Sequence, residues 1–240
     1  MILFNDDTLF VHNPKTAGTS LLSFFQTALP GPVRTAGVKE LGTHHPSLSM
    51  AIGYACGVTG QSSFDRVLTV IRNPWDREVS MYVYFRDVLS TSPALAENLP
   101  DPAMRHRVQK AAELSFKSYL RWLWKTEGTV DVWNSRFFYQ PVEGGRSEAL
   151  HVLRFEHLKR DLDRCLSARA ASVPKMNVSD RGPTASYYDK RTADLVRRSY
   201  RWMFDAGHYD SAAEPQRLRN ITVAAKGRSS FIAGEKNSRS

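Results

Sequence analysis

The sequence predicts an α/β protein in which a central parallel sheet is covered by helices on both faces, in a three-layer α/β/α arrangement. Three observations predict it: short apolar runs recur, each ends in a turn, and each turn precedes a segment with helical periodicity. Strands that alternate with helices in this way form parallel sheets, because each helix carries the chain back to the edge where the next strand starts. We expect one domain over residues 1–215 and a basic, mobile tail over residues 216–240.

The first unit begins with Thr8–His12, an apolar run that breaks at Asn13-Pro14. Gly18–Leu29 then has the composition of a helix, and Pro30-Gly31 ends it. These residues predict a strand, a tight loop and a helix.

Two more units follow the same plan. Arg66–Arg72 predicts a strand that turns at Asn73-Pro74 into a helix running from Trp75 toward Val88, and Leu150–Phe155 predicts a strand before a helix near His157–Ala170. The remaining segments are assigned as helices at 103–125 and 192–204 and as surface loops at 88–102 and 141–148.

Charge is unevenly distributed along the chain. The 33 Lys and Arg against 24 Asp and Glu give a net charge of +9 and point to an anionic partner: a phosphorylated cofactor, an acidic glycan, nucleic acid or a membrane. Residues 1–150 carry 15 basic and 14 acidic side chains, whereas residues 181–240 carry 12 and 6. Most of the excess of basic over acidic residues therefore lies in the C-terminal part of the chain.

Targeting and redox signals are weak. With only Cys56 and Cys165, the chain has neither a disulfide framework nor a cysteine-based metal site. Asp6 and Asp7 stand where a signal peptide would be basic, and no stretch approaches the ~20 apolar residues of a membrane span. The expected location is the cytoplasm.

The loop of the first unit has the features of a phosphate cradle. Between strand and helix lie Pro14, Lys15, Thr16, Ala17, Gly18, Thr19 and Ser20. Small residues let the backbone close around an anion, the helix N-terminus offers N–H groups, and Lys15 adds a positive charge. A Walker A loop would place Lys directly after its last Gly, whereas Lys15 precedes Gly18, so an ordinary ATP or GTP site is not expected.

The second loop offers a partner for this cradle. Arg72 ends its strand where open α/β sheets bind ligands, and Ser80 lies two helical turns into the following helix. A guanidinium and a hydroxyl suit a second phosphate. Taken alone, Arg72 could equally form an ion pair with Asp76.

Together these loops resemble the nucleotide-binding signature of sulfotransferases that use 3′-phosphoadenosine 5′-phosphosulfate (PAPS), especially the carbohydrate branch with its Pro-Lys-Thr-Gly/Ala-Gly-Thr-Ser loop. Later segments are also similar to that family, so the resemblance extends from about Leu9 to Tyr209. They are Leu153–Leu158, Asn177–Ser179, Tyr187-Tyr188 and Phe204–Tyr209.

The resemblance implies a fold like that of P-loop NTPases, PAPS as sulfuryl donor, 3′-phosphoadenosine 5′-phosphate (PAP) as product, and no metal. It implies that the loop 14–20 holds the 5′-phosphosulfate, with Lys15 stabilising the leaving phosphate, and that Arg72 and Ser80 hold the 3′-phosphate. The acceptor is expected to be a hydroxyl of a carbohydrate, glycolipid or other alcohol. Membrane anchor, stem and disulfides, usual in animal members, have no counterpart in the sequence, and oligomeric state has no signal.

A histidine is the natural base for the acceptor hydroxyl. Family members often carry His-x-Ser/Thr between the two loops, which favours His45 of His45-Pro46-Ser47 over His44. His12 is expected at a strand end. The aromatic residues Tyr82, Tyr84, Phe85, Trp122 and Trp124 fit either a sugar platform or the core.

Two other classes stay open. An atypical P-loop kinase or phosphotransferase would require ATP and an acid that holds Mg²⁺. A nucleic-acid-binding protein would use the basic C-terminal part and would bind with steep salt dependence.

Overall fold

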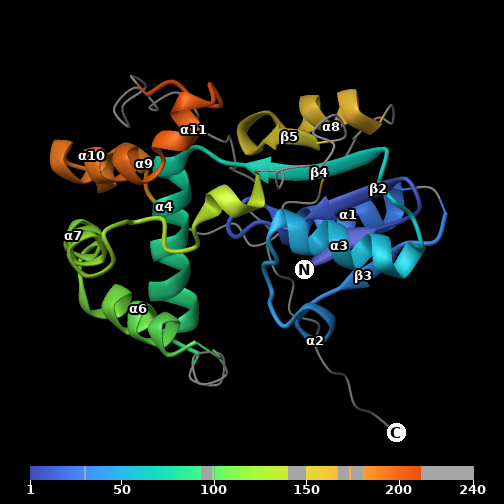
Figure 1. The fold of residues 1–240 in the computed structure, drawn as a ribbon. Coiled ribbons are helices and arrows are strands. Elements are labelled where there is room, and N and C mark those ends of the chain that lie inside the picture. Colours follow the sequence, from blue (N-terminus) through green and yellow to red (C-terminus); the bar gives the residue numbers. More distant parts are fainter. Residues whose placement is uncertain are drawn as a thin grey trace, which may run out of the picture.

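The computed structural model describes residues 1–29, 31–92, 99, 101–139, 150–166, 173 and 181–211. Several predicted features lie outside these residues: the loop 141–148, the segment Asn177–Ser179 and the tail 216–240. The described chain forms an α/β structure around one five-stranded sheet (Figure 1).

The sheet has the strand order β3-β1-β2-β4-β5. The three predicted strands are β2 (Thr8–Val11), β4 (Arg66–Ile71) and β5 (Leu150–Arg154), and they pair in parallel as expected. Two short strands, β1 (Ile2–Phe4) and β3 (Arg34–Ala36), extend the sheet beyond β2. Because β1 pairs antiparallel with both β2 and β3, the sheet is mixed rather than wholly parallel.

Helices cover both faces, which confirms the three layers. Alternate residues of each strand face opposite sides. On one side Phe10 and Leu68 pack against α1 (Gly18–Ala28) and α8 (Leu158–Leu166); on the other side Leu9 and Val67 pack against α3 (Leu48–Thr59). A four-residue helix, α2 (Val38–Leu41), connects β3 with the segment before α3.

Helix α4 (Pro74–Val83) leads from the carboxyl end of β4 into a second, helical part of the molecule (Figure 1). The Asn73 side chain caps it by accepting the amides of Trp75 and Asp76, and Pro74 occupies the first turn, where no N–H is needed. The helix continues as the π-helix η1 (Tyr84–Leu89) and packs on the helices α6 (Pro102–Glu113), α7 (Phe116–Glu127), α9 (Thr184–Tyr187), α10 (Lys190–Ser199) and α11 (Arg201–Asp205).

Two predicted helices are each divided. The one expected over 103–125 breaks at Leu114 and Ser115, because Ser115 has an extended backbone and its hydroxyl accepts the amide of Ser118 as the N-cap of α7. The one expected over 192–204 is interrupted at Tyr200, where α10 ends and α11 begins. A side-chain cap divides the first predicted helix, whereas non-helical backbone at Tyr200, with φ −105° and ψ 19°, divides the second.

Most of the aromatic residues near these helices belong to the core. Tyr82 and Phe85 are buried in the helical core, and the Tyr82 hydroxyl donates to the Leu114 carbonyl at 2.7 Å. Trp122 and Trp124 are partly buried against the same core. Tyr84 instead faces the phosphate loop, as described below.

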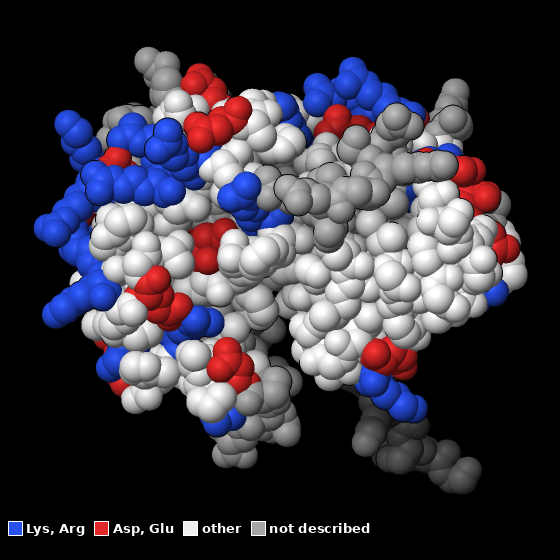
Figure 2. Space-filling model, in the orientation of Figure 1, with Lys and Arg blue, Asp and Glu red and all other residues white. Residues whose placement is uncertain are grey.

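Short 3-10 turns at Ser135–Phe138 (η2) and Phe155–His157 (η4) complete the described chain. None of the helices described is long and apolar enough to cross a bilayer. Figure 2 shows Lys and Arg gathered over α7 and α10, whereas the surface around α3 carries little charge.

Candidate anion-binding site

The loop between β2 and α1 is folded as a cradle whose carbonyl oxygens are tied back. Asn13 pins it to β4, because its amide donates to Thr69 Oγ1 at 2.9 Å and to the Val70 carbonyl at 3.1 Å. Thr16 Oγ1 donates to the Asn13 carbonyl, Arg77 Nε to the Pro14 carbonyl and Arg72 Nη1 to the Lys15 carbonyl. The carbonyl oxygens of Asn13, Pro14 and Lys15, which would repel an anion, therefore all accept hydrogen bonds from side chains.

The backbone of the cradle is bent by left-handed residues. Lys15 has φ 62° and Ala17 has φ 64°, values that L-residues seldom adopt. Left-handed residues next to right-handed ones turn successive N–H groups to one side and form a concave anion site. Ala17 is also the N-cap of α1, so the first amides of that helix, at Gly18 and Thr19, face the same space.

Gly18 is needed for space. An added Cβ there would lie 1.5 Å from Cδ2 and 1.9 Å from Nε2 of His12, so the imidazole packs directly on the start of α1. The sequence predicts a role for Gly18 only in the cradle and places His12 only at a strand end. In the structure His12 forms a wall of the loop.

Cations surround the cradle. Arg72 forms an ion pair with Asp76, with Nε 2.7 Å and Nη2 2.6 Å from Oδ2, and Arg181 Nη2 lies 2.6 Å from Oδ1 of the same carboxylate. The Thr184 hydroxyl also donates to Asp76. The ion pair considered in the sequence is thus present, but one carboxylate serves two arginines.

Lys15, Arg72, Arg181 and Asp76 together carry a net charge of about +2, which the carboxylate of Glu156 near Arg72 reduces to about +1. The charge affects titration: burial, then Arg72 and Arg181, lower the pKa of Lys15 to about 8. Burial alone would raise the pKa of Asp76, but the same two arginines outweigh it and hold that pKa at about 2. The site is short of negative charge, which an anionic ligand would supply.

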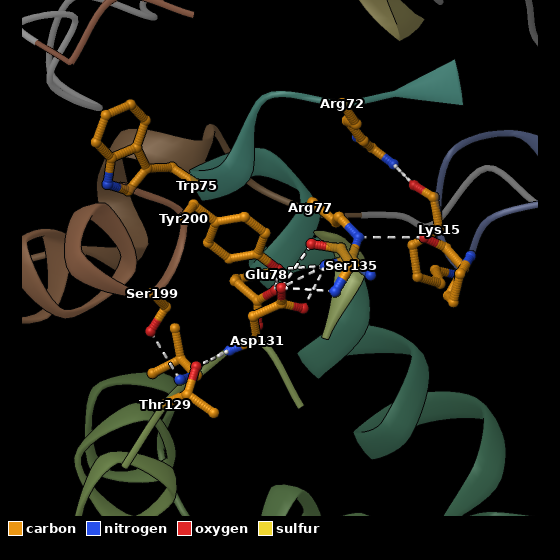
Figure 3. Close-up of polar contacts among 12 residues, drawn as sticks. Lys15, Arg72, Trp75, Arg77, Glu78, Thr129, Asp131, Ser135, Ser199 and Tyr200 are labelled. Atoms are coloured by element: carbon orange, nitrogen blue, oxygen red, sulfur yellow. Dashed lines mark hydrogen bonds and ion pairs between the residues drawn. The ribbon is translucent and has the colours of Figure 1, made fainter. Parts of the chain in front are cut away.

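The other predicted phosphate contacts occupy distinct positions. Ser20 is buried in the first turn of α1. Ser80 is buried on α4, one turn beyond Asp76 and therefore on the same helix face. Lys15 directs Nζ toward the Tyr84 ring, 4.2 Å from its centroid. Figure 3 shows the Arg72 side chain, which follows β4, directed at the main chain of Lys15 in the loop after β2.

His45 lies beside the cradle and His44 lies at the surface. The His45 ring is 5.0 Å from the His12 ring and 5.1 Å from the Trp133 ring, and its Nδ1 is 3.4 Å from the His12 carbonyl. Burial, followed by His12 and the N-terminal charge, lowers the pKa of His45 to about 2, so its imidazole is neutral. His44 is exposed and contributes its backbone carbonyl to the N-terminal amine.

Three of the later segments meet at the second loop. Glu156 accepts the Asn73 amide at 2.7 Å through one oxygen and the Tyr209 hydroxyl at 2.7 Å through the other. The Tyr188 hydroxyl donates to the Trp75 carbonyl at 2.8 Å, which gives it a packing role. These contacts fix the turn that carries Arg72.

Two residues of the site, Arg181 and Arg77, have no signal in the sequence. Arg181 meets Asp76 across 105 positions, and no pattern near Arg181 indicates that partner. Arg77, which holds the Pro14 carbonyl, is 1% exposed and lies within a helix that reads as ordinary in the sequence. Within the described residues, no three His, Cys, Asp or Glu side chains gather as a metal site would require.

No known family model matches this chain, and neither does any curated protein. Among solved structures it is similar to the crystal structure of mouse sulfotransferase SULT7A1 complexed with PAP, at 16% identity and a TM-score of 0.45. The similarity covers 90% of this chain and 89% of that chain. Values of this size do not assign the chain to that protein's family.

Proposed function

We propose that this protein transfers the sulfuryl group of PAPS to a hydroxyl of a carbohydrate, glycolipid or other alcohol. The observation that carries the proposal is the hydrogen bond of 3.0 Å from Arg72 Nη1 to the Lys15 carbonyl. It joins the two loops that resemble the PAPS signature into one cationic site. A ligand with two separate phosphate groups fits two loops better than a single phosphate would.

Binding is divided between the loops in this proposal. The amides of Lys15–Ser20 and the Lys15 ammonium hold the 5′-phosphosulfate. Arg72, with Arg181 beside it and Ser80 on the same helix face, holds the 3′-phosphate. Asp76 keeps the two guanidinium groups in place for that phosphate.

The chemistry assigned to the chain is positioning and charge stabilisation. His45 accepts the proton of the acceptor hydroxyl, whose oxygen forms the new bond to sulfur. The bond between sulfur and the bridging phosphate oxygen breaks, and Lys15 stabilises the charge that collects on that oxygen as PAP departs. With Nδ1 directed to the His12 carbonyl, the Nε2 atom of His45 is the nitrogen that takes the proton.

The deciding experiment measures PAP binding by calorimetry and sulfuryl transfer from labelled PAPS to a panel of hydroxyl acceptors. We expect Lys15→Ala and Arg72→Ala each to abolish transfer. The matched controls are Lys39→Ala on α2 and Arg34→Ala on β3, which remove exposed charges outside the two loops. Full activity in either site variant would refute the residue assignments, and Mg²⁺-dependent turnover of ATP would favour the phosphotransferase alternative.

A further inference from the structure

Arg77 is a fully buried guanidinium directly behind the cradle. Its Nε donates to the Pro14 carbonyl at 3.2 Å, and its Nη1 donates to Asp131 Oδ1 at 3.2 Å and to the Tyr200 hydroxyl. Glu78 Oε1 lies 3.5 Å from Arg77 Nη1 and accepts a hydrogen bond from the Tyr200 hydroxyl. Figure 3 shows this cluster between α4 and the segment that carries Asp131.

The cluster is anchored from distant parts of the chain. Asp131 Oδ2 accepts both the amide and the hydroxyl of Ser135, and the Val130 amide donates to Ser199 Oγ at 2.9 Å. Tyr200 follows α10. Arg77 thus connects the phosphate loop to Asp131, which is 54 positions from Arg77 in the sequence, and to Tyr200, which is 123 positions from it.

A trans peptide bond points its C=O and N–H in opposite directions. When Arg77 holds the Pro14 carbonyl, the Lys15 amide is turned away from Arg77. Arg72 holds the Lys15 carbonyl in the same way and turns the Thr16 amide. Two arginines therefore set two consecutive peptide planes of the cradle, and Lys15 lies between them with a positive φ.

We propose that Arg77 is a positioning residue for the anion cradle: it fixes the Pro14–Lys15 peptide plane, and through it the direction of the Lys15 side chain, without touching the ligand. At 1% exposure it cannot reach a ligand itself. The inference rests on the proposed function in one respect, that the cradle holds the 5′-phosphate of PAPS.

The test compares two substitutions in the same cluster. Arg77→Lys keeps the positive charge beside Asp131 and Glu78, but one ammonium on a flexible stem cannot reproduce the fork that reaches Pro14, Asp131 and Tyr200 together. Ser135→Ala removes the hydroxyl that donates to Asp131 and leaves the bond from Arg77 to Pro14 in place. Both weaken the cluster, and only the first releases the cradle.

The principal readout needs no ligand. Lysine side chains are labelled by reductive ¹³C-methylation, the Lys15 signal is assigned by its loss in Lys15→Arg, and its pKa is measured by NMR. We expect the Lys15 pKa to rise by about one unit or more in Arg77→Lys, because a released side chain reaches solvent. It should not change in Ser135→Ala. PAP affinity should fall about tenfold or more in the first variant only.

An unchanged Lys15 pKa in folded Arg77→Lys, or equal changes in both variants, would overturn the proposal. Should Arg77→Lys not fold, the double variant Arg77→Met/Asp131→Asn removes both buried charges together and is measured in its place. A wild-type protein that binds no PAP would refute the proposed function, whereas the Lys15 titration would still decide the role of Arg77.

Discussion

The guanidinium of Arg72 donates a hydrogen bond of 3.0 Å to the main-chain carbonyl of Lys15, 57 residues away. This hydrogen bond joins the loops that follow β2 and β4. The two loops lie close together because neighbouring parallel strands have their carboxyl ends at the same edge of the sheet. It also places two cations close enough for Arg72 to lower the pKa of Lys15.

That lowered pKa predicts pH-dependent binding. Lys15 is charged below a pKa of about 8 and loses its proton above it, so PAP affinity should fall as pH rises through 8, by up to about tenfold per pH unit. Calorimetry from pH 6.5 to 9.5 measures this. Lys15→Arg, whose guanidinium stays charged, should give a flat profile, and a wild-type profile equally flat would contradict the prediction.

Gly18→Ala should damage the cradle. The new Cβ would overlap the His12 ring, at 1.5 Å from Cδ2, and displacing that ring should cost about 1–3 kcal/mol of stability and weaken PAP binding. Gly53→Ala in α3 is the control, because nothing lies within 4 Å of its added Cβ. It should raise the free energy of unfolding by roughly 0.5–1 kcal/mol, as alanine favours a helix over glycine. Thermal unfolding and PAP titration separate the two outcomes.

The histidines should differ in effect. His45→Ala should reduce transfer by about 10²-fold, the lower end for loss of a general base, because its low pKa makes the imidazole a weak proton acceptor. His44→Ala should remain within a few-fold of wild type because His44 is exposed. Since burial lowers the pKa of His45 to about 2, the base stays neutral and the rate should not fall between pH 7 and 5. A loss of activity centred near pH 6.5 would instead indicate a solvated histidine.

Glu78 should make stability depend on pH. The charges of Arg77 and Asp131 balance, so a second buried carboxylate is unfavourable; burial raises the pKa of Glu78 to about 7 despite Arg77 and Tyr200, which act to lower it. The folded state then binds more protons than the unfolded state between about pH 4.5 and 7, and the free energy of unfolding falls as pH rises through that window.

Glu78→Gln should remove this component, about 1–3 kcal/mol across the window. Chemical denaturation at pH 5 and pH 8 measures it. The matched control is Glu113→Gln, at an exposed position on α6. Identical pH dependence in wild type and Glu78→Gln would show that Glu78 is ionised in the folded protein.

Local sequence determined the parts of this protein whose signals lie within a few residues. The apolar run before Asn13, the cap at Asn73 with Pro74, and the small residues of 14–20 each specify a strand end, a helix start or a loop through neighbouring atoms. For that reason the parallel strands, the helices that follow them and the loop between β2 and α1 could be predicted without coordinates.

Tertiary structure alone decided which charges distant in the sequence meet. Three-residue strands such as β1 and β3 carry too few residues for a pattern, and their pairing comes from the sheet edge they cover. The Arg72–Asp76 pair is local, but the second arginine on Asp76, Arg181, and the contact of the buried Arg77 with Pro14 join residues many tens of positions apart. A contact between such distant residues has no pattern in the local sequence. The attraction between its partners becomes strong only when folding brings them together in the low-dielectric interior.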